Sequence, residues 1–206
     1  INRASPRTQS SLLEAMQEET ISIDGRTIDL PQPFFVIATQ NPITFTGTFP
    51  LPEAELDRFG ISFSLGYATK QEEIKILDLQ KNLNPFKELS TVTNPGEIIE
   101  IRNSLEDINV SLHIKEFIIT IAQRIRSSHF VKLGVSPRSM QHLVAAARAG
   151  ALMNERDFVI PEDVIPLVVP VLAHRTILST EAHMERKSVT DIISDILATT
   201  PVPTGR

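Results

Sequence analysis

A run of polar residues, Thr39, Gln40 and Asn41, follows directly on the apolar segment FFVIA at 34–38. Consecutive apolar residues without alternation are typical of a strand buried on both faces of a parallel sheet. Open α/β sheets bind their ligands just beyond the carboxyl ends of such strands. The sequence therefore predicts a ligand site at Asn41, although an Asn before a Pro can also serve only to cap a turn.

Other kinds of catalytic site find little support. No stretch reads G-x-x-x-x-G-K-[ST], the loop that cradles phosphates, and there is no cysteine for a disulfide, a thiolate metal site or a nucleophile. The histidines have no Asp, Glu or Cys neighbours at a recognised ligand spacing, so we expect no transition-metal site. Glu53, Glu55 and Asp57 share one short helical turn, which is typical of a solvated face rather than of an acid/base pair.

The elements that position Asn41 begin with a helix and a hairpin. Ser5 before a proline predicts the start of a helix that runs to about residue 19. Two alternating runs, 20–23 and 27–30, flank an Asp-Gly pair that tolerates the positive φ angles of a type I′ turn. They predict a β-hairpin that projects with one polar face.

The rest of the N-terminal part continues the predicted sheet. After the strand at 34–38 we expect a Thr-rich loop up to Pro50, a short helix over 52–59 and a further strand over 61–65. Residues 1–66 are therefore predicted to be α/β.

From residue 67 to the end, the periodicity is helical. Thr69 and Glu72 have capping-box spacing and predict a helix start. Further helices are expected at about 95–107, 112–127, 137–154, 161–175 and 189–199, with Ser111, Ser136 and Ser188 as caps. A linker is expected around 83–96, and the Ala- and Gly-rich stretch at 145–151 predicts close helix packing. We expect 67–206 to be all-α.

Composition narrows the classes of function. The net charge is −5 and the pI about 5.6, which argues against a chain that coats nucleic acid or an anionic membrane. The most apolar stretch, 164–173, is interrupted by two prolines, so no membrane insertion is expected. The lack of cysteine fits a reducing compartment, and we expect the cytoplasm.

Several motifs in a fixed order resemble the MoxR family of AAA+ ATPases. They are INRASPRTQSSLLEAMQE, the Asp-Gly hairpin, FFVIATQNP, GTFPLPEAELDRF and VSPRSMQHLVAAARA with IPEDV. The likeness spans essentially the whole chain. It implies the C-terminal part of a AAA+ P-loop core over 1–66, with a parallel sheet and a hairpin insert, and an all-helical AAA+ lid over 67–206. In this family INR follows the acidic pair of Walker B, which is absent here, so we expect a fragment of a longer protein.

The resemblance also implies roles for single residues in binding and hydrolysing ATP. Asn41 corresponds to sensor 1, which contacts the γ-phosphate or the attacking water. Arg58 corresponds to the arginine finger that reaches the neighbouring subunit's site, where a guanidinium suits the charge on transferred phosphate. Arg138 corresponds to sensor 2, at a helix N-terminus that favours phosphate. The alternatives are an ion pair of Arg58 with Glu55 or Asp57, and an ordinary surface role for Arg138. Arg3 would lie just past Walker B at a subunit boundary, with an ordinary arginine ahead of a helix as the alternative.

For the whole protein the resemblance implies a hexameric ring that uses ATP and Mg²⁺. The ring would carry out chaperone-like remodelling of partner proteins, commonly ones with von Willebrand A-type domains. Most Mg²⁺ ligands would lie upstream, so the 206 residues alone are expected to be inactive. A nucleic-acid motor related to the MCM helicases is one alternative, but the hairpin tip carries a single positive charge, at Arg26. A non-catalytic interaction module is the other.

Overall fold

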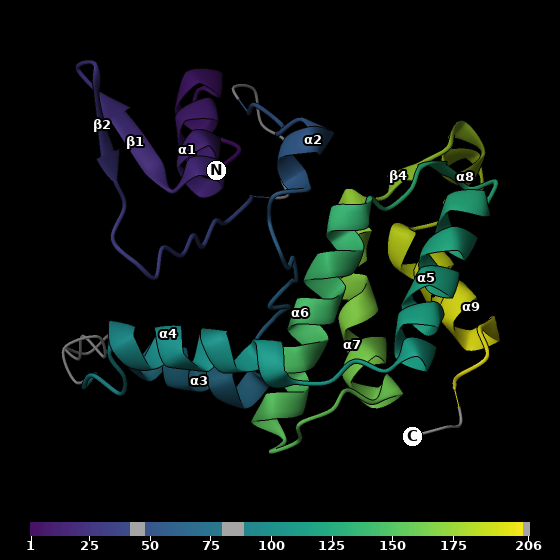
Figure 1. The fold of residues 1–206 in the computed structure, drawn as a ribbon. Coiled ribbons are helices and arrows are strands. Elements are labelled where there is room, and N and C mark those ends of the chain that lie inside the picture. The colour runs from purple at the N-terminus through teal and green to yellow at the C-terminus, as the bar shows by residue number, and fades with distance from the viewer. Residues whose placement is uncertain (42–47, 80–88, 204–206) are drawn as a thin grey trace.

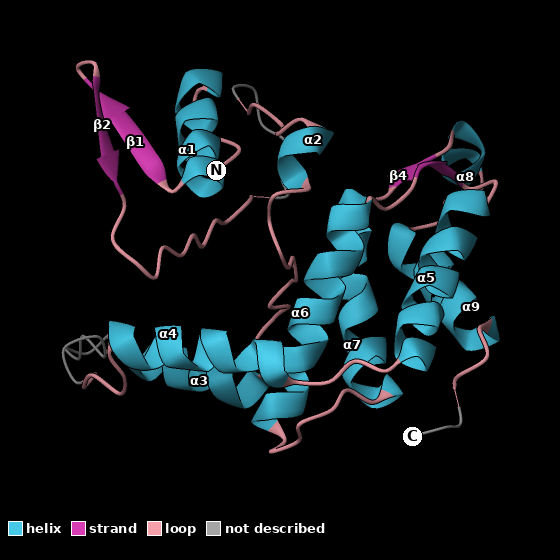
Figure 2. Cartoon of the chain, viewed as in Figure 1, coloured by secondary structure: helices cyan, strands magenta, loops and turns pink. Residues whose placement is uncertain are grey.

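The computed structural model describes residues 1–41, 48–79 and 89–203 (Figure 1). Most of the expected Thr-rich loop, at 42–47, and the first part of the expected linker, at 83–88, lie outside the described residues. Helices dominate the chain, and its strands are short (Figure 2).

The N-terminal part, residues 1–66, opens with the predicted helix and hairpin. Helix α1 (Pro6–Glu18) begins where the Ser5 hydroxyl accepts a hydrogen bond from the Thr8 N–H. Strands β1 (Thr20–Ile23) and β2 (Arg26–Asp29) pair antiparallel. Asp24 and Gly25 have φ angles of 50° and 75°, as a type I′ turn requires, so the hairpin prediction is confirmed.

The polar face of this hairpin is exposed, as predicted, and all of β2 is exposed with it. The apolar face is open too, since Ile23 and Ile28 are each about half exposed. The hairpin therefore projects from the N-terminal part, beside α1 (Figure 1).

The parallel sheet is not formed among the described residues, and the two strands predicted at 34–38 and 61–65 are wrong for this structure. Phe35 is 79% exposed and Leu65 is 92% exposed, where a central strand would be buried. A strand requires a neighbour to accept and donate its backbone hydrogen bonds. No described strand lies beside either segment, so both remain extended coil. Between them, the predicted helix at 52–59 is reduced to α2 (Glu53–Leu56).

Helices fill the remainder of the chain close to the predicted bounds. They are α3 (Lys70–Leu79), α4 (Pro95–Ser104), α5 (Leu112–Ser127), α6 (Pro137–Met153), α7 (Pro161–Leu172), α8 (Thr180–Met184) and α9 (Val189–Thr199). The 3-10 turns η2 (Leu105–Asp107) and η3 (Ala173–Arg175) follow α4 and α7. The predicted caps Ser111, Ser136 and Ser188 each accept the expected backbone hydrogen bond, and the Thr69–Glu72 capping box forms.

Two very short strands were not predicted. β3 (Val131–Leu133) pairs antiparallel with β4 (Ile177–Leu178), so the all-helical expectation for 67–206 missed this pair, as it missed α8. Runs of this length are too short to show an alternating pattern in the sequence.

The hydrophobic core lies among α5, α6, α7 and α9, which we call the bundle. Its largest fully buried side chains include Ile121, Ile125, Leu143, Leu172 and Ile193. Helices α6 and α7 lie side by side (Figure 1), and the small residues Ala147 and Ala151 of α6 are fully buried. Small side chains allow the close approach that the alanine-rich sequence predicted. No helix of the described ranges has both the length and the apolar composition to cross a membrane.

Candidate functional site

The first residues of the chain lie beside the segment that ends at Asn41. The Ile1 nitrogen donates to the Thr39 carbonyl at 2.5 Å. The Asn2 side chain donates to the Asn41 carbonyl at 3.0 Å and accepts from the Asn41 N–H at 3.3 Å. Arg3, the next residue, is exposed. Residues nearly forty positions apart in the sequence are thus held together around Asn41.

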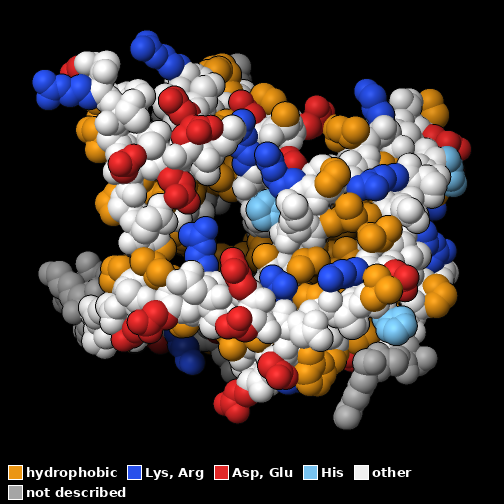
Figure 3. Space-filling view, in the orientation of Figure 1, with side chains coloured by type: hydrophobic (Ala, Val, Ile, Leu, Met, Phe, Trp, Pro, Cys, Tyr) orange, Lys and Arg blue, Asp and Glu red, His pale blue; other side chains and the backbone are white. Residues whose placement is uncertain are grey.

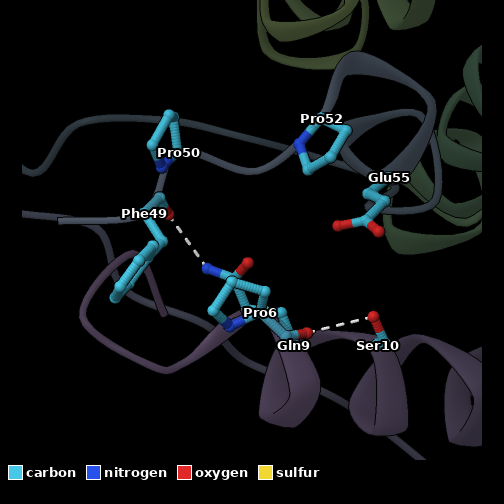
Figure 4. A pocket seen from close by; sticks show the side chains of 7 residues that line it. All are labelled: Pro6, Gln9, Ser10, Phe49, Pro50, Pro52 and Glu55. Carbon is cyan, nitrogen blue, oxygen red and sulfur yellow. Dashed lines mark hydrogen bonds between the residues drawn. The ribbon is translucent and has the colours of Figure 1, made fainter.

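Gln9 connects this region by hydrogen bonds to the segment that precedes α2 (Figure 4). Its side chain is almost completely buried and donates to the carbonyls of Phe49, at 2.9 Å, and Ile1, at 3.3 Å. The Phe49 N–H donates in turn to the Asn2 carbonyl at 2.8 Å. A shallow pocket beside Gln9 is lined by Pro6, Ser10, Phe49, Pro50, Pro52 and Glu55. These contacts set the path by which the chain enters α2 and reaches Arg58.

Arg58 lies just past α2, and its side chain turns toward α1 of its own chain. Its Nη1 donates to the Leu13 carbonyl at 2.9 Å. Its Nε is buried and has no hydrogen-bond partner among the described residues. No ion pair joins Arg58 to Glu55 or Asp57 in the described part of the chain, so the intrahelical pair considered from the sequence is not seen. The guanidinium keeps donor capacity that the fold does not use.

Asp57, predicted to belong to a solvated acidic face, instead faces the bundle. Its carboxylate accepts hydrogen bonds of 3.1 Å from the hydroxyls of Ser136 and Ser139, in the first turn of α6. It also pairs with Arg175, whose Nε lies 3.4 Å from Oδ1. Glu53 is exposed, as predicted, but Glu55 is half-buried, with its Oε2 buried. The prediction fails for Asp57 because its partners come from distant parts of the sequence.

Two residues of η3 hold the backbone on either side of Arg58. Arg175 donates from Nη2 to the carbonyls of Phe59 and Asp57, the latter at 3.2 Å. His174 Nε2 contacts the Phe59 carbonyl at 2.9 Å, which requires that this nitrogen carry the proton. We call this region the junction; it comprises Asp57, Phe59, Ser136, Ser139, His174 and Arg175. Sequence reasoning missed Arg175 and His174, because an arginine and a histidine after an apolar helix carry no distinctive spacing.

Electrostatics at the junction follow from its burial. Burial lowers the pKa of Arg175, while the neighbouring Asp57 opposes this shift. Burial also lowers the pKa of His174, opposed by its contact with the Phe59 carbonyl, and that of His142, with the charge of Arg175 adding to the effect. Figure 3 shows basic and acidic side chains intermingled over this face of the molecule. The lowered pKa values keep both histidines neutral near pH 7, so Arg175 is the cation that faces the Asp57 carboxylate in the junction.

Arg138 lies at the second position of α6, one residue after Pro137, and is exposed. Its charge lowers the pKa of both His142 and Arg175, which places it near the junction. Ser136 and Ser139, which flank Arg138 in α6, both donate to the carboxylate of Asp57, the residue before Arg58. Asn41 is held separately, beside Asn2, and connects to Arg58 through α1.

No group of three or more His, Cys, Asp or Glu side chains within residues 1–41, 48–79 and 89–203 is arranged to hold a metal ion. We therefore assign no Mg²⁺ ligand to the described residues.

Comparison with known families divides the chain in two. Residues 1–61 match the ATPase family associated with various cellular activities (AAA). Residues 123–196 match the AAA lid domain. The first match contains Asn41 and Arg58, and the second contains Arg138 and Arg175.

Similar proteins match almost the whole chain. The uncharacterized protein YeaC of Bacillus subtilis is 43% identical over 100% of the chain and 64% of its own length. Chaperone MoxR1 of Mycobacterium tuberculosis is 35% identical over 98% of the chain and 56% of its own length. Protein MoxR of Paracoccus denitrificans is 30% identical over 98% of the chain and 66% of its own length. The chain thus spans less than two thirds of the length of these relatives.

A solved structure gives the same fold. The crystal structure of a candidate ATPase from Cytophaga hutchinsonii superimposes with a TM-score of 0.90 at 34% sequence identity, covering 98% of this chain and 64% of that one.

Proposed function

Because the chain belongs to the MoxR family of AAA+ ATPases, we propose that the full-length protein hydrolyses ATP and uses the energy to remodel partner proteins. The observation that carries this proposal is the junction, at which one carboxylate joins the segment of Arg58 to the helix start that bears Arg138. Two arginines from the two matched families are therefore available at one boundary. Each guanidinium suits the charged phosphates of a nucleotide.

Each proposed residue has a distinct role toward ATP. Asn41, through its side-chain amide, would orient the attacking water or the γ-phosphate. Arg138 would contact phosphate at the N-terminus of α6, where the helix dipole and free N–H groups favour an anion. Arg58 would supply the arginine finger to the neighbouring subunit.

The sequence of 206 residues contains no G-x-x-x-x-G-K-[ST] loop. We therefore propose that these residues do not hydrolyse ATP by themselves. We also keep the division at residue 66 between core and lid as a proposal. Mg²⁺, when bound with ATP, would neutralise charge on the phosphates.

A finger that acts in trans requires a ring, so we propose a homo-oligomer, with six subunits as in the family's usual form. Arg58 now contacts the Leu13 carbonyl of its own chain, and it would exchange that neutral acceptor for the phosphate of the next subunit. The proposed clients are proteins with von Willebrand A-type domains, and the cytoplasm is the proposed location. No observation favours a nucleic-acid motor, since the hairpin tip has Arg26 as its single basic residue.

The test uses full-length protein and three variants: Arg58→Ala, Asn41→Ala and a variant lacking the lysine of the phosphate-binding loop. Arg58→Ala should bind nucleotide within a few-fold of wild type, while turnover falls about 10²-fold or more, because transition-state charge loses its partner. Asn41→Ala should show a similar loss of rate.

Mixing distinguishes the two roles. Arg58→Ala subunits mixed with the lysine variant should regenerate active interfaces, because an intact finger then faces an intact loop. Asn41→Ala subunits should regenerate none, since both lesions spoil sites in cis. If Arg58→Ala fails to complement where mixed rings form, the finger assignment is wrong. If full-length protein neither binds nor hydrolyses ATP, the alternative of a non-catalytic interaction module replaces the proposal.

A further inference from the structure

Side chains of η3, which directly follows α7 of the bundle, contact the backbone on both sides of Arg58. The Arg175 side chain, 1% exposed, donates to the carbonyls of Asp57 and Phe59, which are the residues directly before and after Arg58. His174 adds a second contact to the Phe59 carbonyl. Two consecutive residues of η3 therefore fix the backbone from which the Arg58 side chain departs.

The same set of contacts includes the helix that carries Arg138. The Asp57 carboxylate, paired with Arg175, accepts hydrogen bonds from Ser136 and Ser139. These serines are the N-cap and third residue of α6, and Arg138 lies between them. One carboxylate thus joins three elements: the turn of Arg58, the start of α6 and η3.

The burial of Arg175 makes this connection difficult to break. Asp57 is the acidic residue whose charge acts on the Arg175 guanidinium, and Nη1 of that guanidinium has no hydrogen-bond partner among the described residues. Withdrawing Asp57 would leave a buried cation without its anion, which is strongly unfavourable. The turn of Arg58 and the start of α6 are therefore expected to move together.

We propose that Asp57 and Arg175 form a latch through which the position of the bundle sets the direction of the Arg58 side chain. Arg175 is then a positioning residue that acts through Arg58 and does not itself contact nucleotide. The inference rests on the proposed function, since it assumes that Arg58 acts in ATP hydrolysis. A nucleotide held by Arg138 on the bundle would thereby be coupled to the finger that the same subunit offers to its neighbour.

The test measures ATP turnover and nucleotide binding in full-length protein carrying Arg175→Ala. Turnover should fall by about tenfold to 10²-fold, because a displacement of about 1 Å at a reacting group can cost that much, while nucleotide affinity changes little. The turnover of the double variant Arg58→Ala/Arg175→Ala should stay within about twofold of that of Arg58→Ala alone, because the residue through which Arg175 acts is already gone.

Arg156→Ala is the matched control. Arg156 forms the other arginine–aspartate ion pair among the described residues, with Asp163 at 2.5 Å, and has no described contact with residues 57–59. Its loss should reduce stability but leave turnover nearly unchanged at a temperature where the variant remains folded. The latch is refuted if Arg175→Ala lowers turnover no more than Arg156→Ala does. It is also refuted if turnover in the double variant falls by the product of the two single-variant losses.

Asp57→Asn tests the latch independently if Arg175→Ala does not fold. It retains an oxygen acceptor for both Ser136 and Ser139, which donate to Oδ1, but removes the charge opposite Arg175. It should show the same loss of turnover as Arg175→Ala and the same non-additivity with Arg58→Ala. Additive losses would overturn the latch. Failure of the proposed function looks different: Arg58→Ala would then itself turn over ATP at the wild-type rate.

Discussion

Replacing Asp57 by Asn should destabilise the protein, although its sequence neighbours Glu53 and Glu55 suggest an exposed acidic face. Asn has nearly the same shape, so the substitution removes charge and one acceptor without opening a cavity. The carboxylate accepts bonds from Ser136 and Ser139 and pairs with Arg175. Both hydroxyls lie 3.1 Å from Oδ1, so an amide oxygen in that place can still accept from both, and only the second contact of Ser136, to Oδ2, is lost. The main loss is the charge opposite Arg175.

The magnitude follows from burial. Breaking a fully buried ion pair by removing one partner costs about 3–5 kcal/mol. Here the Arg175 side chain is 1% exposed but that of Asp57 is 23% exposed, so water screens part of the interaction. We therefore expect a loss in the free energy of unfolding of about 2 kcal/mol, below the range for full burial. For a chain of this size, that loss corresponds to a fall in Tm of about 4–8 °C.

Thermal and urea denaturation, followed by circular dichroism, measure this difference. Glu53→Gln is the matched control, because Glu53 is exposed in the same short helix and its charge change is identical. The control should change the free energy of unfolding by less than about 0.5 kcal/mol. If Asp57→Asn also stays within that limit, the junction does not hold the N-terminal part to the bundle, and the solvated-face interpretation is right.

Two further predictions concern the bundle. Burial lowers the pKa of His142 and His174 below 6.5, so the unfolded chain binds more protons than the folded one as the pH falls below that value. The stability that the neutral histidines contribute is complete above about pH 6.5 and is lost below it. The urea concentration at the unfolding midpoint should therefore fall between pH 7.5 and 5, and His174→Gln should make this fall smaller. A fall of the same size in His174→Gln would contradict this account. Gly134→Ala should cost about 1–3 kcal/mol in thermal denaturation, because its new Cβ would lie 2.8 Å from Arg126 Cγ and 3.0 Å from Arg126 Cα; a variant as stable as wild type would show that this contact relaxes freely.

Features that depend on neighbouring residues could be predicted from the sequence. Ser5 and Ser136 cap helices with their own hydroxyls, and the Asp24–Gly25 turn requires only residues that tolerate positive φ. The strand at 34–38 could not be judged in this way. Its apolar composition fits a buried strand, but whether it becomes one depends on partners far away in the sequence, and none pairs with it among the described residues.

The candidate site shows the same limit for side chains. Asn41, Arg58 and Arg138 were selected by their resemblance to family motifs, and the structure adds the contacts that join two of them. Those contacts span 79 positions from Asp57 to Ser136 and 118 from Asp57 to Arg175. A short-range pattern contains no information on them, so the sequence groups Asp57 with Glu53 on a solvated face.

Adjacent residues in the turn after α2 serve opposite sides of the molecule. Successive residues of a helical turn point about 100° apart, given 3.6 residues per turn. Asp57, still in the helical conformation, therefore faces the bundle, while Arg58 faces α1 and donates to the Leu13 carbonyl. A small rotation of this turn would change the surroundings of both side chains together. Because Asp57 is tied to Arg175 by charge and Arg58 is tied to Leu13 only by a neutral acceptor, Arg58 is the side chain that such a rotation releases more easily. Asp57 and Arg58 thus combine a fixed contact with a releasable one in consecutive residues. An arginine finger whose position depends on the bundle requires this combination.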